Sequence, residues 1–531
     1  MLQVKENSSK ILFILCAILV SIIVTSLRFY QLDLLQAEVY GDINIVHEYM
    51  SDVLSGKWPF YFALSSGPLY HYLIAPVLLI FGKNYFAIKI ASVVISLIVL
   101  FFVFLISRNI FNSWFAITAT LLAGCSSWLL IFSRLGNSQM VAPLLAVTAF
   151  FLFVKYTETR KEIYIFLSGI VCGLGFFGYP QTFAITPAIF TAIICSIFSR
   201  LRLPIKSIVT FSAAVTIMAF PFIIILKSDI INFTSGYIGG KAKTDIPIYL
   251  ALARNIEKGV LGLFSLSDGN FRSNPAGEPL LTIYSGFLFL VGLIYLYFSK
   301  YRAWFLPLFA QVVILQLPSW LVLANSGEVP SASRTLAAAP FIFIFIAAGV
   351  WFATQFCEEL NFRYRIKFMH FIIPIVIILL VSYQESSRYF GKYIAGLPYK
   401  NTPIARYIVD YIKSQPVNAK VHIINCCWES GMPEPKGIEF ELPHPENFFH
   451  IEHTDELNCD NLQSYDEGSI FIWNYHENIP LPQLEACKDQ LMGETKYSEK
   501  GLPLFNVARI TKVGQYKSSA SFPLPTVIPA L

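Results

Sequence analysis

Two acidic residues stand in a short polar stretch that follows the first long apolar run of the sequence. Glu38 and Asp42 lie in the segment Glu-Val-Tyr-Gly-Asp. A carboxylate at such a boundary can act as a general base, because it can take a proton from a hydroxyl group whose oxygen is forming a new bond. The plainer interpretation is that Asp42 caps a following helix, since Asp is a favoured N-cap residue. Asp42 is the first candidate for a catalytic base, and Glu38 is the second.

Three arginines share a setting, because each stands in a polar segment beside an apolar run. They are Arg134 in Ser-Arg-Leu-Gly-Asn, Arg272 in Asp-Gly-Asn-Phe-Arg and Arg334 in Pro-Ser-Ala-Ser-Arg. A guanidinium group matches phosphate oxygens with paired hydrogen bonds. Long basic side chains also reach lipid headgroups without a specific ligand, and this interpretation weighs about as much. His71, in Gly-Pro-Leu-Tyr-His-Tyr, is a further phosphate-binding candidate, although such a histidine is more often a hydrogen-bonded member of an aromatic belt.

Neither a metal nor an organic cofactor is expected. The histidines His444, His450 and His453 have no set of partners at ligand-like spacing. The stretch Gly-Leu-Gly-Phe-Phe-Gly at 173–178 imitates a dinucleotide fingerprint, but it lies inside an apolar run without flanking strands. Close helix packing explains its glycines better.

The elements that must position these residues are mostly apolar. Of the 531 residues, 55% are hydrophobic and only 14% are charged, whereas a soluble domain carries about 25% charged residues. Lipid can face such apolar surface directly, so the composition favours a polytopic membrane protein. The formal net charge of +5 is small for this length, and no basic stripe with interleaved aromatic residues indicates a nucleic-acid partner.

Apolar runs of about 20 residues span a bilayer as helices. Candidates are 11–27, 68–82, 86–106, 115–132, 139–154, 163–179, 181–198, 207–226, 280–298, 303–323, 336–356 and 368–384. Basic residues gather in cytoplasmic connections, which fixes a predicted orientation with the N-terminus inside. These residues are Arg108, Lys155, Arg160, Lys161, Arg200, Arg202, Lys206, Lys300, Arg302, Arg363, Arg365 and Lys367.

The predicted orientation places the loops 28–67 and 227–279 and the segment after residue 384 on the external side. Twelve full crossings would return the chain to the cytoplasm. We therefore expect about eleven crossings, with either 68–82 or 115–132 as a re-entrant or interfacial segment. Apolar positions at helical spacing in 43–55 predict a helix along the membrane surface.

The chain is therefore expected to have two parts, a transmembrane domain over 1–384 and an external domain over 385–531. A helical run at 403–413 and strand-like runs at 421–425 and 469–473 predict that the second part is a small α/β domain. Four of the nine cysteines lie in it, and in an oxidising compartment they allow one or two disulfides. These are Cys426, Cys427, Cys459 and Cys487.

The order of the motifs resembles the bacterial glycosyltransferase family 39, relatives of the protein O-mannosyltransferases and of the lipid A aminoarabinose transferase. No single motif carries the resemblance, which covers most of residues 28–400 through its order and spacing. The similar pieces are 40–42, 55–59, 67–76, 81–82, 133–143, 268–279, 328–334 and 389–390.

The resemblance implies the C-type glycosyltransferase fold, a polyprenyl-phosphate sugar donor and inversion at the sugar carbon. It also implies an acidic base in the first external loop, where Asp42 stands, and a phosphate-binding role for Arg134, Arg272 and Arg334. The sequence departs from the pattern at Ile43, where many relatives have Glu. It departs again at Ser66 and Gly67, where some relatives carry a basic residue.

We therefore predict a membrane glycosyltransferase that moves a hexosyl or pentosyl group from a polyprenyl-phosphate donor to an external protein, lipid or cell-envelope glycan. It would lie in the inner or plasma membrane, with its active site and C-terminal domain external. The main alternative is a transporter or flippase of lipid-linked sugars, but such proteins usually show inverted repeats and polar midplane helices. A polysaccharide polymerase or ligase, and a membrane anchor for the C-terminal domain, are further alternatives.

Overall fold

The computed structural model of the chain describes residues 2–36, 38, 43–57, 67–226, 246–323, 326–364, 369–425, 428 and 435–511. Asp42, Cys426 and Cys427 lie outside these ranges. The chain forms two compact units, Met1–Pro403 and Ile404–Leu531. The predicted domain boundary at residue 384 falls within a helix of the first unit, α17.

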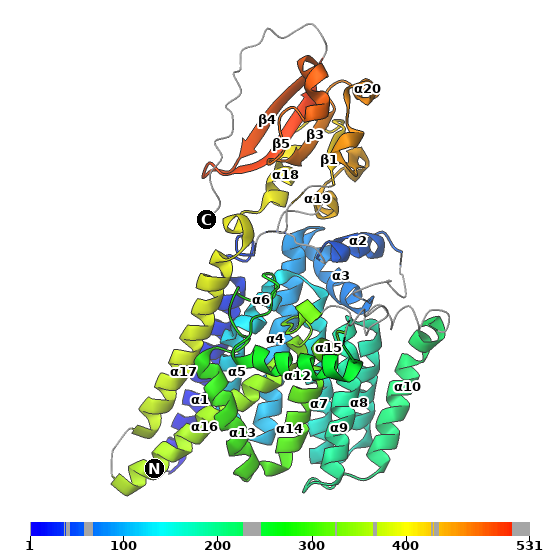
Figure 1. Ribbon diagram of the computed structural model, residues 1–531. Coiled ribbons are helices and arrows are strands. Elements are labelled where there is room, and N and C mark those ends of the chain that lie inside the picture. Colours follow the sequence, from blue (N-terminus) through cyan, green and yellow to red (C-terminus); the bar gives the residue numbers. More distant parts are fainter. Residues whose placement is uncertain are drawn as a thin grey trace. The chain divides into compact units, whose positions relative to one another are not determined.

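The first unit is a bundle of helices (Figure 1). Each of the apolar runs predicted from the sequence forms a helix or a pair of helices, and the helix expected over 43–55 is present as α2. The helices are α1 (Leu2–Phe29), α2 (Ile43–Leu54), α3 (Leu69–Phe81), α4 (Tyr85–Ile110), α5 (Ser113–Cys125), α6 (Ser127–Leu135), α7 (Val141–Thr159), α8 (Glu162–Leu174), α9 (Ile185–Ile197), α10 (Lys206–Leu226), α12 (Ile248–Phe264), α13 (Ile283–Phe298), α14 (Phe305–Ile314), α15 (Leu317–Trp320), α16 (Ala339–Tyr364) and α17 (Met369–Ser387), which continues as a π-helix, η7 (Arg388–Tyr393).

Within the described residues, seven helices are long and apolar enough to cross a membrane, or eight if the bent pair α5–α6 counts as one span. Three shorter apolar helices accompany them, at Leu69–Phe81, Glu162–Phe177 and Ile283–Phe298. The sequence predicted about eleven crossings. Both segments suspected of not crossing are exceptional in the structure, because 68–82 forms the short α3 and 115–132 is broken by a 62° bend. The chain is a multi-pass integral membrane protein.

The basic connections lie together at one end of the bundle, here called the basic end. Arg160, between α7 and α8, donates a hydrogen bond from Nη2 to the carbonyl of Leu201 between α9 and α10, at 2.6 Å. The ring of Phe111, between α4 and α5, lies 4.8 Å from that of Tyr301, between α13 and α14. The described connections 30–36, 265–282 and 326–335 lie at the opposite end, called the loop end.

The break between α5 and α6 is held by a buried acid on α17. Glu385 is 1% exposed, and its Oε2 accepts hydrogen bonds from both the backbone N–H and the hydroxyl of Ser127, each at 2.9 Å. Its Oε1 lies 3.0 Å from the hydroxyl of Thr282 and 2.6 Å from that of Ser285, at the start of α13. One carboxylate thus joins three elements and satisfies an N–H that a helix start leaves without an intrahelical partner.

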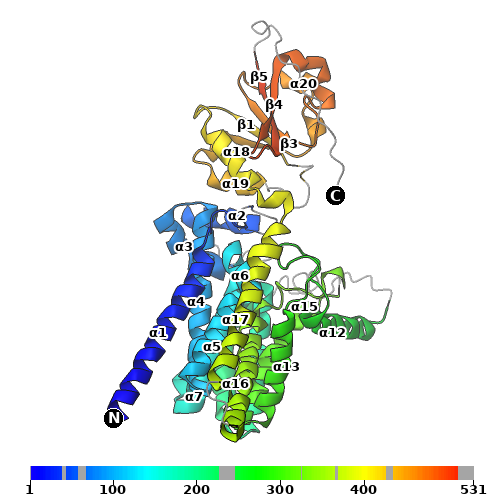
Figure 2. The same ribbon diagram turned by 90° about the vertical axis from the view of Figure 1, so that its left-hand side faces the viewer.

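A helix that the sequence analysis missed lies crosswise to the spanning helices in both views (Figure 1 and Figure 2). This helix, α12, occupies 248–264, a region that we expected to be part of a long loop. Asn255 donates to the carbonyls of Trp320 and Val322, at 3.0 and 2.8 Å. A Cβ on Gly259 would stand 2.1 Å from Nε1 of Trp320, so the docked face of α12 requires a glycine there.

The second unit is the α/β domain that the sequence predicted. Its five-stranded sheet has the order β2-β1-β3-β5-β4, with β1 parallel to β2 and β3, and β5 antiparallel to β3 and β4. Cys459 and Cys487 form a disulfide. The elements are α18 (Ile404–Lys413), β1 (Val421–Ile424), α19 (Pro435–Glu441), β2 (Phe448–Ile451), α20 (Cys459–Leu462), β3 (Ile470–Asn474), β4 (Leu491–Tyr497) and β5 (Pro503–Ile510).

The Glu385 contacts generate a stability prediction. Glu385→Ala removes the acceptor of one buried N–H and of three hydroxyls, and each orphaned donor costs about 1–3 kcal/mol. We expect the free energy of unfolding in detergent to fall by about 3 kcal/mol or more. The matched control is Glu358→Ala, which removes an exposed acid from α16. Equal melting temperatures for the two variants would contradict the assigned role of Glu385.

Candidate functional site

The candidate residues lie around the point where α1 ends, at the loop end of the bundle. Arg134, in the last turn of α6, is fully buried there. Its Nη1 donates to the carbonyls of Leu27 and Arg28, both at 2.8 Å, and its Nη2 donates to that of Tyr30 at 2.7 Å. The last carbonyls of a helix have no intrahelical donor and carry partial negative charge, so a buried cation stabilises them. Arg134 therefore caps α1, and its predicted phosphate-binding role stays a prediction.

Lys89 binds the turn that follows α1, although the sequence analysis did not single this lysine out. Its ammonium group donates to the carbonyls of Leu32, Leu35 and Gln36 at 2.7, 2.9 and 2.8 Å. The side chain is 1% exposed and comes from the first turns of the apolar helix α4. A lone lysine inside an apolar run is the signal that could have found it, since an ionisable residue in such a run is by default a candidate.

Gln36 connects the cap to the helix that leads toward the second unit. This glutamine is buried, its Oε1 accepts from the hydroxyl of Tyr389 at 2.9 Å, and its Nε2 donates to that of Tyr393 at 2.8 Å. The hydroxyl of Tyr393 in turn donates to the backbone carbonyl of Arg272 at 2.8 Å. The guanidinium carbon of Arg134 lies 5.4 Å from the Tyr389 ring centre. Segments near residues 36, 134, 272 and 390 are therefore joined.

Arg272 and Arg334 are brought together by the loop that contains Asp268. The Asp268 carboxylate accepts from the N–H of Asn270 at 2.9 Å and from that of Ala332 at 2.8 Å, which ties the 268–272 segment to the turn before Arg334. The Oδ1 of Asn270 accepts from the backbone N–H of Arg272 at 3.1 Å and lies 3.4 Å from its Nε. Burial raises the pKa of Asp268, while these N–H groups and the charge of Arg334 oppose the rise.

Arg272 and Arg334 differ in whether an acidic side chain pairs with the guanidinium group. Arg334 forms an ion pair with Glu328, and its side chain is 16% exposed while that of Glu328 is 46% exposed. In the part of the chain that the structure describes, Arg272 uses only Nε among its guanidinium nitrogens for a hydrogen bond. Trp128 of α6 donates to the carbonyl of Ala332 at 2.9 Å, so α6 supports the Arg334 turn as well as the end of α1.

His71 contacts α2 and the residues directly before its own helix, α3. It is buried in the first turn of α3, where its Nδ1 lies 3.1 Å from the Gly67 carbonyl and its ring lies 5.5 Å from that of Tyr49 on α2. Gly67 has a φ of +56°, and a Cβ there would stand 2.3 Å from the carbonyl oxygen of Phe177. The start of α3 can therefore approach the 175–178 turn only with glycine at position 67.

Of the two acidic candidates, only Glu38 is within the described residues, where it is 1% exposed. Asp42 lies outside them, directly before the first residue of α2, Ile43. The described residues at the loop end thus include the buried Glu38 and, in other loops, Arg272 and Arg334. Such a combination can hold an anion and take up a proton.

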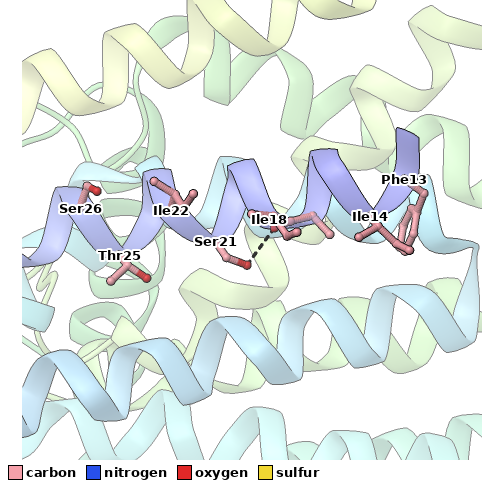
Figure 3. Close-up of a pocket in the computed structure, with 8 residues that line it drawn as sticks. Phe13, Ile14, Ile18, Ser21, Ile22, Thr25 and Ser26 are labelled. Carbon is pink, nitrogen blue, oxygen red and sulfur yellow. Dashed lines mark hydrogen bonds between the residues drawn. The ribbon is translucent and has the colours of Figure 1, made fainter. Parts of the chain in front are cut away.

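An open apolar groove runs along α1 as far as Ser26, the residue before the carbonyls that Arg134 caps. It has a volume of about 580 Å³, and Figure 3 shows its lining side chains along α1. Its polar groups are hydroxyls, and that of Ser21 donates to the carbonyl of Ala17 at 2.8 Å. The remaining lining residues are Phe13, Ile14, Ile18, Ile22, Thr25 and Ser26.

The capping contacts of Arg134 generate a second prediction. Arg134→Lys keeps the positive charge, but one ammonium group cannot reach the carbonyls of Leu27 and Arg28 together with that of Tyr30. We expect a loss of about 1.5–3 kcal/mol in the free energy of unfolding, the contribution of a hydrogen bond to a charged group. Arg108→Lys at the basic end, where the side chain is exposed, is the control. A melting temperature of Arg134→Lys that matches the control would show that the cap contributes nothing.

The sequence is similar to a known protein family over part of its length. Residues 65–225 match the family model of dolichyl-phosphate-mannose-protein mannosyltransferases. No curated protein matches the chain by sequence.

Solved structures share the fold over nearly the whole chain. ArnT from Cupriavidus metallidurans in its apo state is 11% identical, with a TM-score of 0.56, over 95% of this chain and 98% of that protein. The same enzyme bound to undecaprenyl phosphate is 10% identical over 94% and 98%, also with a TM-score of 0.56. The oligosaccharyltransferase AglB from Archaeoglobus fulgidus, in complex with an inhibitory peptide and a dolichol-phosphate, is 14% identical over 94% and 74%, with a TM-score of 0.51.

The shared fold is the one that the sequence predicted, a helical membrane domain followed by a small α/β unit. The matched segment 65–225 begins before α3 and ends in α10, so it includes the α5–α6 break and Arg134. Residues 65–225 thus resemble the mannosyltransferase family, and the chain as a whole shares the fold of ArnT, in agreement with the resemblance that the motif order had indicated.

Proposed function

We propose that the protein transfers a sugar from a polyprenyl-phosphate carrier to a hydroxyl group of an external protein, lipid or cell-envelope glycan. The observation that carries the proposal is the cluster of Arg272, Arg334 and Asp268 at the loop end of a membrane bundle. ArnT and AglB, which share the fold, were solved with undecaprenyl phosphate and dolichol-phosphate. A carrier of this kind keeps its chain in the bilayer and presents its phosphate at the rim.

The reaction follows from a single displacement. The acceptor oxygen bonds to the sugar carbon while the bond from that carbon to the carrier phosphate breaks, and the phosphate leaves with the electron pair. The acceptor proton passes to Asp42. One displacement inverts the configuration at the sugar carbon. Groups that stabilise the charge developing on the leaving phosphate lower the barrier directly.

Arg272 and Arg334 are the residues that we assign to the leaving phosphate. Their loops are polar and joined through Asp268, and Arg272 has guanidinium nitrogens to spare within the described structure. The Glu328 partner of Arg334 is half-exposed, and an ion pair in such a setting contributes only about 0–1 kcal/mol. A phosphate can therefore displace Glu328 at small cost. Arg134 and His71 are retained as predicted contributors.

We further propose that the loop end is external. The basic connections lie at the other end, and basic residues favour the cytoplasmic side. The chain passes from α17 to the second unit at the loop end, because Asn401 donates to the carbonyl of Leu34 at 2.8 Å. The second unit contains the Cys459–Cys487 disulfide, which forms in oxidising compartments. Both observations support the same orientation.

Donor binding can be tested with undecaprenyl phosphate alone. Arg272→Ala or Arg334→Ala removes a charge-assisted hydrogen bond worth about 1.5–3 kcal/mol, so the affinity should fall roughly tenfold to a hundredfold. Arg302→Ala at the basic end is the matched control and should leave the affinity unchanged. The affinities are measured by thermophoresis in detergent. If both loop-end variants bound undecaprenyl phosphate as tightly as the control, the proposal that this cluster binds the phosphate would be wrong.

The general base is tested by Asp42→Asn, which keeps the shape of the side chain but removes its basicity. Loss of a general base typically slows a reaction by a factor of about 100 to 10,000. We expect this loss in the release of undecaprenyl phosphate from its mannose conjugate, with carrier binding nearly intact. Glu38→Gln should lose less. If Asp42→Asn turned over at a near-normal rate, Glu38 would become the candidate base.

A further inference from the structure

The helix α12 has three sides of different chemistry. One side is docked on the bundle through the buried residues Ala251, Asn255 and Gly259. A second side is apolar but exposed, and it recurs at spacings of seven, four and four residues, which keeps its members on one flank of a helix. These members are Tyr249, Ile256, Val260 and Phe264, which are 70%, 37%, 44% and 37% exposed. The third side has the charged residues Arg254, Glu257 and Lys258, and the exposed Leu250 and Leu261 lie between it and the apolar side.

The apolar flank continues into surface that faces lipid. The ring of Phe264 lies 6.3 Å from that of Phe289 on α13, and Gly286 of α13 leaves room for it. On α13, Ile283 and Phe287 are 76% and 66% exposed. These residues belong to an apolar helix of a membrane-embedded bundle, so the flank of α12 lies at the edge of the hydrocarbon region.

We propose that α12 lies in the outer interface of the bilayer and docks on anionic phospholipids there. Its crosswise direction (Figure 2) is the one that an interfacial helix adopts. Its apolar flank enters the acyl region, and Arg254 and Lys258, four residues apart on the opposite flank, meet the phosphate groups. A membrane interface suits this helix, because the exposed apolar side chains favour the acyl chains and the basic pair favours the headgroup layer.

The lipid contact is tied to the donor cluster by the docked side. A Cβ on Gly262 would stand 2.4 Å from Cβ of Pro330, in the segment that contains Glu328 and Arg334. The N–H groups of Leu280 and Leu281, which precede α13, donate to the carbonyls of Gly262 and Leu263 at 2.8 and 3.1 Å. The bilayer would thus position α12. In turn, α12 contacts the segment before α13 and the turn before Arg334, and Asp268 is hydrogen-bonded to that turn.

Photocrosslinking tests the proposal without any assay of turnover. Benzoylphenylalanine replaces Val260 on the apolar flank, Val209 on the spanning helix α10, or Val417 in the second unit; the last two valines are 64% and 70% exposed. The full-length variants are placed in nanodiscs of phosphatidylcholine with a minor share of phosphatidylglycerol. We expect a lipid adduct at position 260 at a yield close to that at 209 and several-fold above that at 417.

The basic flank is tested in the same experiment. Arg254→Gln with Lys258→Gln, in the chain labelled at position 260, should lower the phosphatidylglycerol share of the adduct toward its share in the bulk lipid. Adduct yield at 260 no higher than at 417 would overturn the interfacial position, and an unchanged phosphatidylglycerol share would overturn the anionic preference. Each variant must elute as a single folded species, and neither result depends on whether the transferase assay succeeds.

Discussion

The fold depends on how the end of α1 is satisfied inside apolar surroundings. The last carbonyls of a helix lack intrahelical donors, and no water reaches them when they are buried. Arg134 from α6 donates to the carbonyls of Leu27 and Arg28, and Lys89 from α4 donates to those of the turn at 32–36 that follows. Both side chains are at most 1% exposed. Because each cation would be costly to bury alone, and each carbonyl costly to leave unpaired, neither partner is stable without the other.

This mutual requirement explains why the loop end is built as one network. Once Arg134 is fixed, its ring contact with Tyr389 and the hydrogen bonds of Gln36 with Tyr389 and Tyr393 fix η7. Glu385, one turn earlier on the same long helix, holds the start of α6 through Ser127. The two ends of α6 are therefore both attached to the α17 segment, and the loop with Arg272 is bonded to that segment as well.

The sequence predicted the helices well because apolar length and period leave few alternatives in a bilayer. It predicted neither α12 nor the structural roles of the buried charged side chains. The docked side of α12 uses Asn255 and Gly259, so its pattern is not that of a two-sided amphipathic helix. Arg134 lies at a helix end in the sequence, and the same position suits a cap or a phosphate ligand. The carbonyls of Leu27 and Arg28, distant along the chain, show the cap, while the phosphate-binding role stays a prediction.

The surroundings of each basic side chain indicate its role. Some basic side chains stabilise the fold around the site, and others are accessible to a ligand. Lys89 and Arg134 come from apolar helices, where a charge must find its partners within the protein, and backbone carbonyls supply them. Arg272 and Arg334 come from polar loops, where water can stabilise the charge until an anion arrives. A transferase that releases a phosphate needs the second kind at its rim. It also needs buried basic side chains such as Lys89 and Arg134, which keep the surrounding loops in place when the product leaves.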